Sequence, residues 1–202
     1  MEDRRIHPRD DFLTRLITDL GETGSVTPEE AIVQIMLLII AGTDTTRVAG
    51  GAVVSLLLQH REQWDAVCGD AGLIPKAVAE ALRFEPSVGS VARFSLEPIE
   101  LDGRILPKEA TVSLSLMSAM RDERVYANAD TFDIFRDDGP RIHPIFGGGA
   151  HRCLGEALAK AELEESLAAL TQRLPQLRLA GAPPVIIGHA AIRRIGPMHC
   201  TV

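Results

Sequence analysis

A long apolar segment near the start constrains this chain most, because nothing in it stops a helix between Pro28 and about Gln59. Thr27 can cap the helix N-terminus, proline suits the first helical position, and Glu30 completes a Thr-x-x-Glu capping box. At 1.5 Å per residue, such a helix spans on the order of 45 Å and could cross a whole domain. Its apolar surface is almost continuous around the axis, which favours burial between layers of structure.

A membrane span is the alternative for this segment, and two charged residues in its middle argue against it. Asp44 and Arg47 would each cost about 2.5–3.5 kcal/mol at a bilayer centre. The opening residues, Met-Glu-Asp-Arg-Arg, lack the apolar stretch of a signal peptide. We therefore expect a cytoplasmic protein that makes no membrane contact.

Charge and cysteine content narrow the possible functions further. A net charge of −7 argues against nucleic acid as a partner, because phosphate binding requires a basic surface. The three cysteines are far apart and odd in number, so they do not suggest a disulfide framework. A length of 202 residues allows one domain with a real core, and we expect residues 1–202 to form a single domain.

Beyond the long helix, the apolar period alternates between helical and strand spacing. Asp102-Gly103 is a hairpin turn signal, and residues 121–145 lack a steady period, which predicts an irregular but packed connection. The tail predicts one more strand or hairpin around 185–187. The fold class is thus mainly α with small β-sheets. The other predicted elements are helices over 9–20, 61–68, 75–84 and 156–174, and strands over 91–94, 99–101 and 111–116.

The segment Phe146-Gly-Gly-Gly-Ala-His-Arg-Cys-Leu-Gly155 holds the strongest candidate site. Its three central glycines let the backbone turn tightly and approach a flat ligand. Cys153 precedes a predicted helix N-terminus, where the helix dipole and free N–H groups favour a thiolate. A thiolate is the ligand that a haem iron requires if the O–O bond is to be broken.

Other functions of glycine-rich or cysteine-bearing loops fit these residues less well. A phosphate loop would need Lys followed by Ser or Thr, and a dinucleotide loop would need a glycine in place of Arg152. A zinc site lacks a second nearby cysteine, and His151 is too close in sequence for the usual ligand spacing. A catalytic cysteine paired with His143 or His151 stays open, as does a buried and inert cysteine.

Two further patterns carry polar residues at helical spacing. Glu80 and Arg83 can pair across one helical turn, although a solvated surface pair of this kind is common and weak. In the long helix, the run Ala41-Gly-Thr-Asp-Thr-Thr46 interrupts apolar sequence, and Ala41 and Thr45 share a face. A kink in which threonine hydroxyls bond back to carbonyls would explain this run without any function.

Together, these motifs resemble the cytochrome P450 family of haem-thiolate monooxygenases, in its soluble bacterial form. The family's haem signature is Phe-Gly-x-Gly-x-(Arg/His)-x-Cys-x-Gly, and the loop 146–155 matches every fixed position. Glu80 and Arg83 match the family's Glu-x-x-Arg motif, a buried structural pair completed by a later arginine, where Arg136 stands. The sequence departs from the family at Met120, usually Asn, and at Glu123, usually Pro.

The resemblance implies a haem b site with Cys153 as the ligand of the iron. Phe146 would pack beside the sulfur, and the N–H groups of Leu154 and Gly155 would donate hydrogen bonds to it. The propionates would meet His151 and Arg93, since an arginine fork suits a carboxylate. Gly147 would let the backbone approach the haem.

The resemblance places the polar run of the long helix on the other face of the haem. Ala41 in this run is expected to contact the cofactor. There, Asp44 would be the acid and Thr45 the alcohol that steer protons to bound dioxygen. These two residues are therefore the expected catalytic residues.

The resemblance covers nearly the whole chain, yet it accounts only for the C-terminal half of a family member. It implies insertion of one oxygen atom of dioxygen into a small organic substrate. Electrons would come ultimately from NAD(P)H through a ferredoxin-type donor. A non-catalytic haem-binding or interaction remnant is the alternative, and a helical scaffold without a cofactor is a third possibility. Without its usual cover, the long apolar helix predicts self-association or a separately supplied N-terminal half.

Overall fold

The computed structural model describes residues 2–23, 27–139 and 144–202. It is mainly helical with small two-stranded sheets, as the sequence predicts. The helices are α1 (Glu2–Ile6), α2 (Phe12–Thr23), α3 (Pro28–Gln59), α4 (Arg61–Gly69), α5 (Ile74–Phe84), α6 (Leu116–Ala119) and α7 (Glu156–Arg173), with 3-10 turns η1 (Ala71–Leu73), η2 (Pro144–Phe146) and η3 (Gly149–His151). The strands are β1 (Ser90–Phe94), β2 (Ile99–Leu101), β3 (Arg104–Leu106), β4 (Thr111–Ser115), β5 (Arg178–Leu179), β6 (Ile186–Ile187), β7 (Arg194–Ile195) and β8 (Cys200–Thr201).

The chain divides into two compact units, Met1–Thr43 and Asp44–Val202. In the first unit, Asp11 accepts a hydrogen bond from the backbone N–H of Thr14 at 2.8 Å, at the start of α2. This bond, with the Thr14 side chain and Arg4, lowers the pKa of Asp11 to about 2. The predicted capping box of α3 is present: Glu30 N–H donates to Thr27 Oγ1 at 3.2 Å, and Thr27 N–H donates back to Glu30 Oε2 at 2.8 Å.

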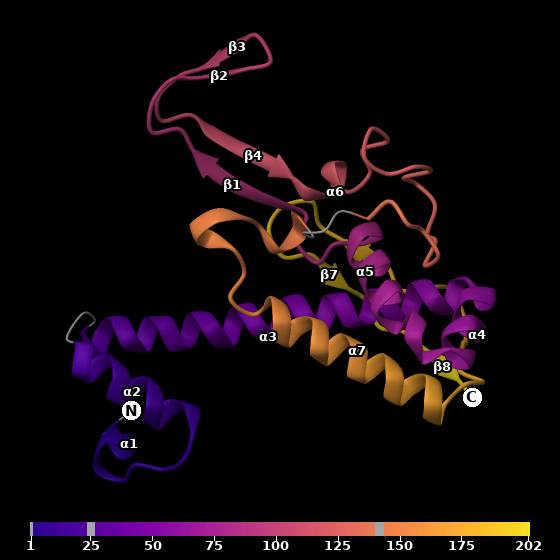
Figure 1. Ribbon diagram of the computed structural model, residues 1–202, viewed down its shortest axis with the longest axis horizontal. Helices are drawn as coiled ribbons and strands as arrows, with labels where there is room; N and C mark the ends of the chain where they lie inside the picture. Colours follow the sequence, from indigo (N-terminus) through magenta and orange to yellow (C-terminus); the bar gives the residue numbers. More distant parts are fainter. Residues whose placement is uncertain (1, 24–26, 140–143) are drawn as a thin grey trace. The chain divides into compact units, whose positions relative to one another are not determined.

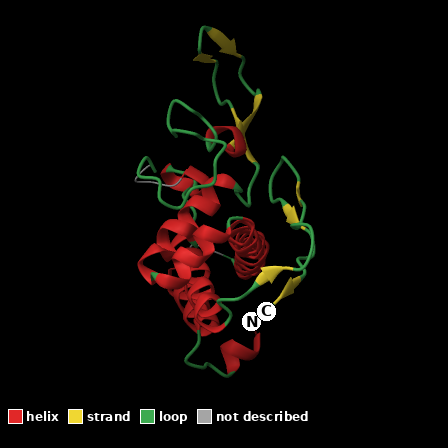
Figure 2. Ribbon diagram, turned by 90° about the vertical axis from the view of Figure 1, so that its right-hand side faces the viewer, coloured by secondary structure: helices red, strands yellow, loops and turns green. Residues whose placement is uncertain are grey.

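The second unit has a helical core in which the latter part of α3 packs with α4, α5 and α7 (Figures 1 and 2). Two adjacent glycines let α3 approach its neighbours. A Cβ at Gly50 would lie 3.5 Å from Leu163 of α7, and one at Gly51 would clash with Ile195 of β7 at 2.7 Å. The core side chains are apolar and fully buried, including Val53, Leu57, Trp64, Val67, Val78 and Leu167.

The predicted hairpin is present, because β2 and β3 pair antiparallel and turn through Asp102 and Gly103, whose φ angles are 49° and 71°. The hairpin continues beyond the antiparallel pair β1–β4 (Figure 1). The tail forms more than the one strand or hairpin expected from sequence, since β6 pairs with β7 and β5 pairs with β8. These strands are two residues long, which is too short to show an alternating pattern in sequence.

The stretch Glu29–Gln59 of α3 is long enough and apolar enough to cross a membrane. Buried core helices of water-soluble proteins meet the same two criteria. Within the second unit, the α3 residues Val48, Ala49, Ala52 and Val53 are nearly inaccessible to solvent. In the first unit, by contrast, large apolar side chains of α3 are exposed. They are Ile32, Val33, Met36, Leu37, Leu38, Ile39 and Ile40.

Candidate functional site

The loop that carries Cys153 is exposed and ends at the N-terminus of α7. Cys153 has a free thiol, and its backbone N–H donates to the carbonyl of Phe146 at 2.8 Å, which closes the loop. Gly147 and Gly149 have φ angles of +71° and +67°, in the left-handed region that side chains disfavour. Gly155 is the N-cap of α7 and supplies no side-chain cap. The loop therefore presents a thiol at a helix N-terminus, where an anionic sulfur is favoured.

Three charged residues at helical spacing lie on either side of the thiol in the sequence. Glu156, in the first turn of α7, pairs with Arg152 and with Lys160, the latter at 2.8 Å. The hydrogen bond from Lys160, together with the charge of Arg152, holds the pKa of Glu156 below its ordinary value of 4.5. Lys160 also lies 5.3 Å from the ring centroid of Phe146. These contacts link the two ends of the loop to the same helical turn.

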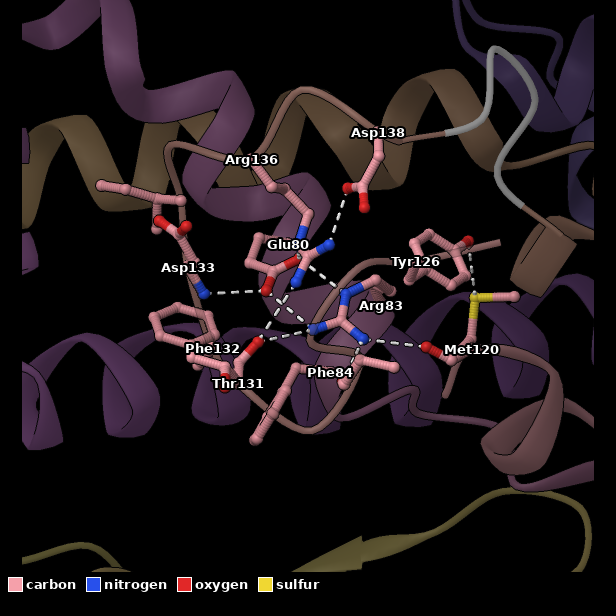
Figure 3. Close-up of polar contacts among 12 residues, drawn as sticks. Glu80, Arg83, Phe84, Met120, Tyr126, Thr131, Phe132, Asp133, Arg136 and Asp138 are labelled. Carbon is pink, nitrogen blue, oxygen red and sulfur yellow. Dashed lines mark hydrogen bonds and ion pairs between the residues drawn. The ribbon is translucent and has the colours of Figure 1, made fainter. Parts of the chain in front are cut away.

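A buried ionic network surrounds Glu80 on α5 (Figure 3). Glu80 and Arg83 are 3% and 2% exposed, and the guanidinium meets both carboxylate oxygens, at 2.7 and 2.8 Å. Arg136 Nε approaches Glu80 Oε2 at 2.8 Å, as the third member expected from the sequence. The backbone N–H of Asp133 also donates to Glu80, at 2.9 Å. The predicted surface-pair alternative is therefore wrong, because the pair is completely enclosed.

Arg83 uses all five of its N–H donors, because three further bonds go to backbone carbonyls. It donates to Met120, Ala129 and Thr131 at 2.8, 2.7 and 3.0 Å. These carbonyls belong to the irregular connection after β4, which the sequence predicted to be packed. The network thus fixes the path of a segment that has little secondary structure of its own.

Two more residues enclose the network. Asp138 accepts a hydrogen bond from Arg136 at 2.7 Å. Burial lowers the pKa of Arg136, but its interactions with Asp138 and Glu80 outweigh burial, so the net direction is upward. Tyr126 is 1% exposed, burial raises its pKa, and its hydroxyl lies 3.6 Å from the sulfur of Met120. The departure from the family at Met120 therefore places a buried thioether beside this tyrosine.

The other predicted site residues lie on three separate elements. Arg93 is exposed on β1, and its side chain donates to the carbonyl of Ala92 at 2.8 Å. On α3, Asp44 pairs with Arg47 at 3.6 Å, and both side chains are more than half exposed. Thr45 follows Asp44 in the second unit, whereas Ala41 belongs to the first unit. His151 and Leu154 are exposed on the cysteine loop.

The polar run in α3 does not interrupt the helix. Thr43 Oγ1 donates to the carbonyl of Ile39 at 2.7 Å, as expected for back-bonding, yet α3 is continuous from Pro28 to Gln59. The back-bonding predicted for this run is therefore present, and the kink itself stays a prediction. His143, one of the two histidines considered as the partner of a catalytic Cys153, lies outside the described residues.

Comparisons with known proteins place this chain in a family. The model of the family "Cytochrome P450" matches residues 71–178, more than half of the chain. The plant-inducible cytochrome P450-pinF1 of Rhizobium radiobacter is 46% identical over 190 residues, covering 94% of this chain and 45% of that protein. A steroid C26-monooxygenase of Mycolicibacterium smegmatis is 36% identical over 182 residues, covering 90% and 45%.

Solved structures agree with this assignment. The tirandamycin C-bound P450 monooxygenase TamI matches with a TM-score of 0.91 at 31% identity, over 98% of this chain and 50% of that one. P450BioI, in complex with a ligated acyl carrier protein, matches with a TM-score of 0.90 at 34% identity, over 100% and 50%. The chain belongs to the cytochrome P450 family, and its fold is the predicted one. It spans about half the length of the relatives it matches.

The family implies a haem, and the cysteine loop fits one. Across the described ranges, no cluster of three or more His, Cys, Asp or Glu side chains could hold a bare metal ion. A single exposed thiol instead suits an iron whose remaining ligands come from a macrocycle. A Cβ at Gly155 would lie in ordinary van der Waals contact with Cys153 Sγ, at 4.0 Å, so residue 155 borders the sulfur. Apolar Leu154, the residue after Cys153, and Leu158, in the first turn of α7, are 87% and 65% exposed.

Some interactions around these motifs were not found from sequence. The charged residues Arg152, Glu156 and Lys160 are spaced four apart, and this i, i+4 pattern could have predicted their pairing. A second buried arginine, Arg193, pairs with Glu85 across 108 positions of sequence, and no local pattern signals that contact. Asp138 likewise became recognisable only through its bond to Arg136.

Proposed function

We propose that this chain is the C-terminal, haem-binding part of a cytochrome P450 monooxygenase, with residues 1–202 forming part of one larger domain. The observation that carries the proposal is the free, exposed Cys153 thiol on a glycine loop at the start of α7. Cys153 would be the ligand of the haem iron. The bound haem would supply the activation of dioxygen, so that one oxygen atom enters a small organic substrate.

Other residues of the loop would hold and tune the sulfur. The bond from Cys153 N–H to the Phe146 carbonyl fixes the loop, and Gly147 allows its tight turn. The N–H groups of Leu154 and Gly155 would stabilise negative charge on the sulfur, as donors at a helix N-terminus do. His151 on this loop and Arg93 on β1 would bind the haem propionates, because both are exposed and carry N–H donors that suit carboxylates.

Proton delivery is assigned to α3. The Asp44 carboxylate is within 3.6 Å of Arg47 and more than half exposed, so it can exchange protons with water. The Thr45 hydroxyl would pass a proton inward from Asp44, and Ala41 would leave room for the cofactor on the same helical face. Electrons would come from NAD(P)H through a ferredoxin-type donor, and the complete protein would act in the cytoplasm without membrane or nucleic-acid contact.

The alternative is a haem-binding or interaction remnant without a working pocket. An absorbance spectrum of the reduced, carbon-monoxide-bound chain tests both proposals. A strongly red-shifted main band supports thiolate-bound haem, and an unshifted haem band contradicts thiolate ligation. Absence of a haem band would instead favour a helical scaffold. Product formation with an added electron donor then separates the monooxygenase from the remnant.

A further inference from the structure

Arg193 is a buried arginine outside the proposed haem site, and it contacts both its own turn and a segment more than 100 residues away in the sequence. It is 5% exposed and forms an ion pair with Glu85, just after the end of α5. Its Nη1 also donates to the carbonyl of Pro86 at 3.2 Å, and its Nε donates to the carbonyl of Gly188 at 3.1 Å. One guanidinium therefore joins the chain after α5 to the turn between β6 and β7.

The backbones of the same two segments are hydrogen-bonded to each other. Arg193 N–H donates to the carbonyl of Ser87 at 2.8 Å, and Gly89 N–H donates to the carbonyl of Ala191 at 2.9 Å. Val88 and Ile192 form an antiparallel bridge between these bonds. A Cβ at Gly89 would lie only 2.6 Å from the carbonyl oxygen of His189, so glycine is required for this approach.

The turn held in this way is conformationally strained. Ala191 has a φ of 49° and Gly188 a φ of 104°. A non-glycine residue in the left-handed region is unfavourable and persists where its surroundings determine the conformation. Ala191 supplies the carbonyl that Gly89 binds, so the strained residue is one of the contact points. The buried ion pair and the two carbonyl bonds of Arg193 provide the required restraint.

Gly89 also connects to the strand pair that carries Arg93. Its carbonyl accepts bonds from the N–H groups of Leu116 and Met117, at 3.0 and 3.2 Å, where β4 passes into α6. The next residue, Ser90, begins β1 and pairs with Ser115. The position of Gly89 therefore sets where β1 begins, three residues before Arg93.

We propose that Arg193 is a positioning residue, which holds the strained turn 188–192 against residues 87–89 and thereby fixes the start of β1 and the placement of Arg93. The proposal rests on the proposed function only in counting Arg93 as a haem contact. Glu85 is the anionic anchor of this arrangement. Arg121, 3.8 Å from the same carboxylate, assists it from a partly exposed position.

Amide hydrogen exchange on the haem-free chain tests the restraint directly. In Arg193→Met, the amides of Gly89 and Arg193 should exchange at least about tenfold faster, while buried amides in the middle of α7 keep their rates. Arg193→Lys keeps the charge opposite Glu85 but loses the planar fork, so its rates should lie between those of wild type and Arg193→Met. If Arg193→Met does not fold, the exchange rates of Arg193→Lys alone test the restraint. Arg194→Met, which removes the exposed neighbouring arginine, is the matched control and should change neither set.

Unchanged exchange at Gly89 in both Arg193 variants would overturn the proposal. So would equal acceleration throughout the second unit, because that pattern describes a purely structural arginine. Haem transfer to excess apomyoglobin tests the link to Arg93 in the loaded protein. If Arg193 acts through Arg93, the double variant Arg93→Ala/Arg193→Met should lose haem no faster than Arg93→Ala. Additive rates would overturn the link. An unchanged rate in Arg93→Ala alone would count against the proposed haem contact, while the exchange pattern still decides the restraint.

Discussion

The Glu80 network and the Cys153 loop differ in how many of their polar groups find partners within the chain. Around Glu80, both carboxylate oxygens and all five donors of Arg83 find partners from this chain, and the two residues are at most 3% exposed. Around Cys153, the thiol is free and Leu154 is 87% exposed. The carboxylate and the guanidinium of the first region have their partners within the chain, whereas the thiol of the second region is accessible to a ligand.

The largest effect is expected for Glu80→Ala. Removing one partner of a buried ion pair leaves uncompensated charge and costs about 3–5 kcal/mol of folding free energy. Urea denaturation of the variant measures this loss. Asp137→Ala, which removes an exposed pair with Lys76 at 3.3 Å, is the control and should leave the midpoint unchanged. A normally stable Glu80→Ala chain would show that the network is dispensable.

Cys153→Ala should do the reverse, with a large effect on ligand binding and almost none on folding. Substitutions at exposed positions usually change stability by less than about 0.5 kcal/mol. The red-shifted carbon-monoxide spectrum should disappear, because no other thiol is similarly placed. Burial raises the pKa of Cys68, and Cys200 lies on β8, outside any glycine-rich loop. Cys200→Ser is the control. A red-shifted spectrum that survives Cys153→Ala would refute the ligand assignment.

The exposed apolar part of α3 should affect how the chain associates with other copies of itself. Met36, Ile39 and Ile40 lie on neighbouring positions of one helical face and are 56%, 63% and 54% exposed. Apolar patches of this kind promote association, so the chain should scatter light as a dimer or larger species. Met36→Lys/Ile40→Lys should shift it towards monomer, whereas Val125→Lys, at an apolar residue 52% exposed elsewhere, should not. A clean monomer that binds no apolar dye would mean that this surface is covered.

Thr45→Ala should change the oxygen chemistry of the protein and leave its folding unchanged. The variant should keep its haem spectrum but, in any assembly that turns over, divert reduced oxygen to peroxide. Positioned acid–base groups typically contribute about 10²–10⁴-fold to rate. The ratio of product formed to electrons consumed is the measurement, with Thr43→Ala as the control, since its hydroxyl bonds to the Ile39 carbonyl. Equal ratios in wild type and Thr45→Ala would remove Thr45 from the mechanism.

The smallest effect is electrostatic and lies at the edge of the cysteine loop. The pKa of Glu156 is below 4.5 because of Lys160 and then Arg152. A depressed carboxyl pKa stabilises the fold above the ordinary value, and this contribution is lost as the pH falls through the lowered pKa. Lys160→Met should move the pKa of Glu156 back towards 4.5, while Lys160→Arg should largely preserve it. Carboxyl carbon NMR titration detects the shift, and an unchanged pKa in Lys160→Met would contradict the pairing.

Sequence spacing predicted those parts of the molecule that depend on local geometry. The helix Pro28–Gln59, its capping box and the Asp102-Gly103 hairpin follow from periodicity and turn chemistry, and all three are present. The pairing of Glu80 with Arg83 and Arg136 was expected from the family motif and is also present. The assignments of Cys153, Asp44 and Thr45 stay predictions.

Longer-range features could not be predicted in this way. The carbonyl partners of Arg83 are backbone atoms, so no side-chain identity in the sequence marks them. The pairing of Arg193 with Glu85 depends on the return of the tail to α5, which only tertiary packing determines. The strained φ of Ala191 is set by the same packing and has no glycine to signal it.

The five bonds of Arg83 also bear on the order in which the chain folds. Its three carbonyl partners lie 37, 46 and 48 residues further along the sequence. Each bond closes a loop, and the entropy of closure depends only weakly on loop length. After the first closure, the other two add little further cost, since their carbonyls are already nearby. The connection from Met120 to Thr131 should therefore become ordered in one late, cooperative step, and its protection from proteolysis should appear and disappear as a whole.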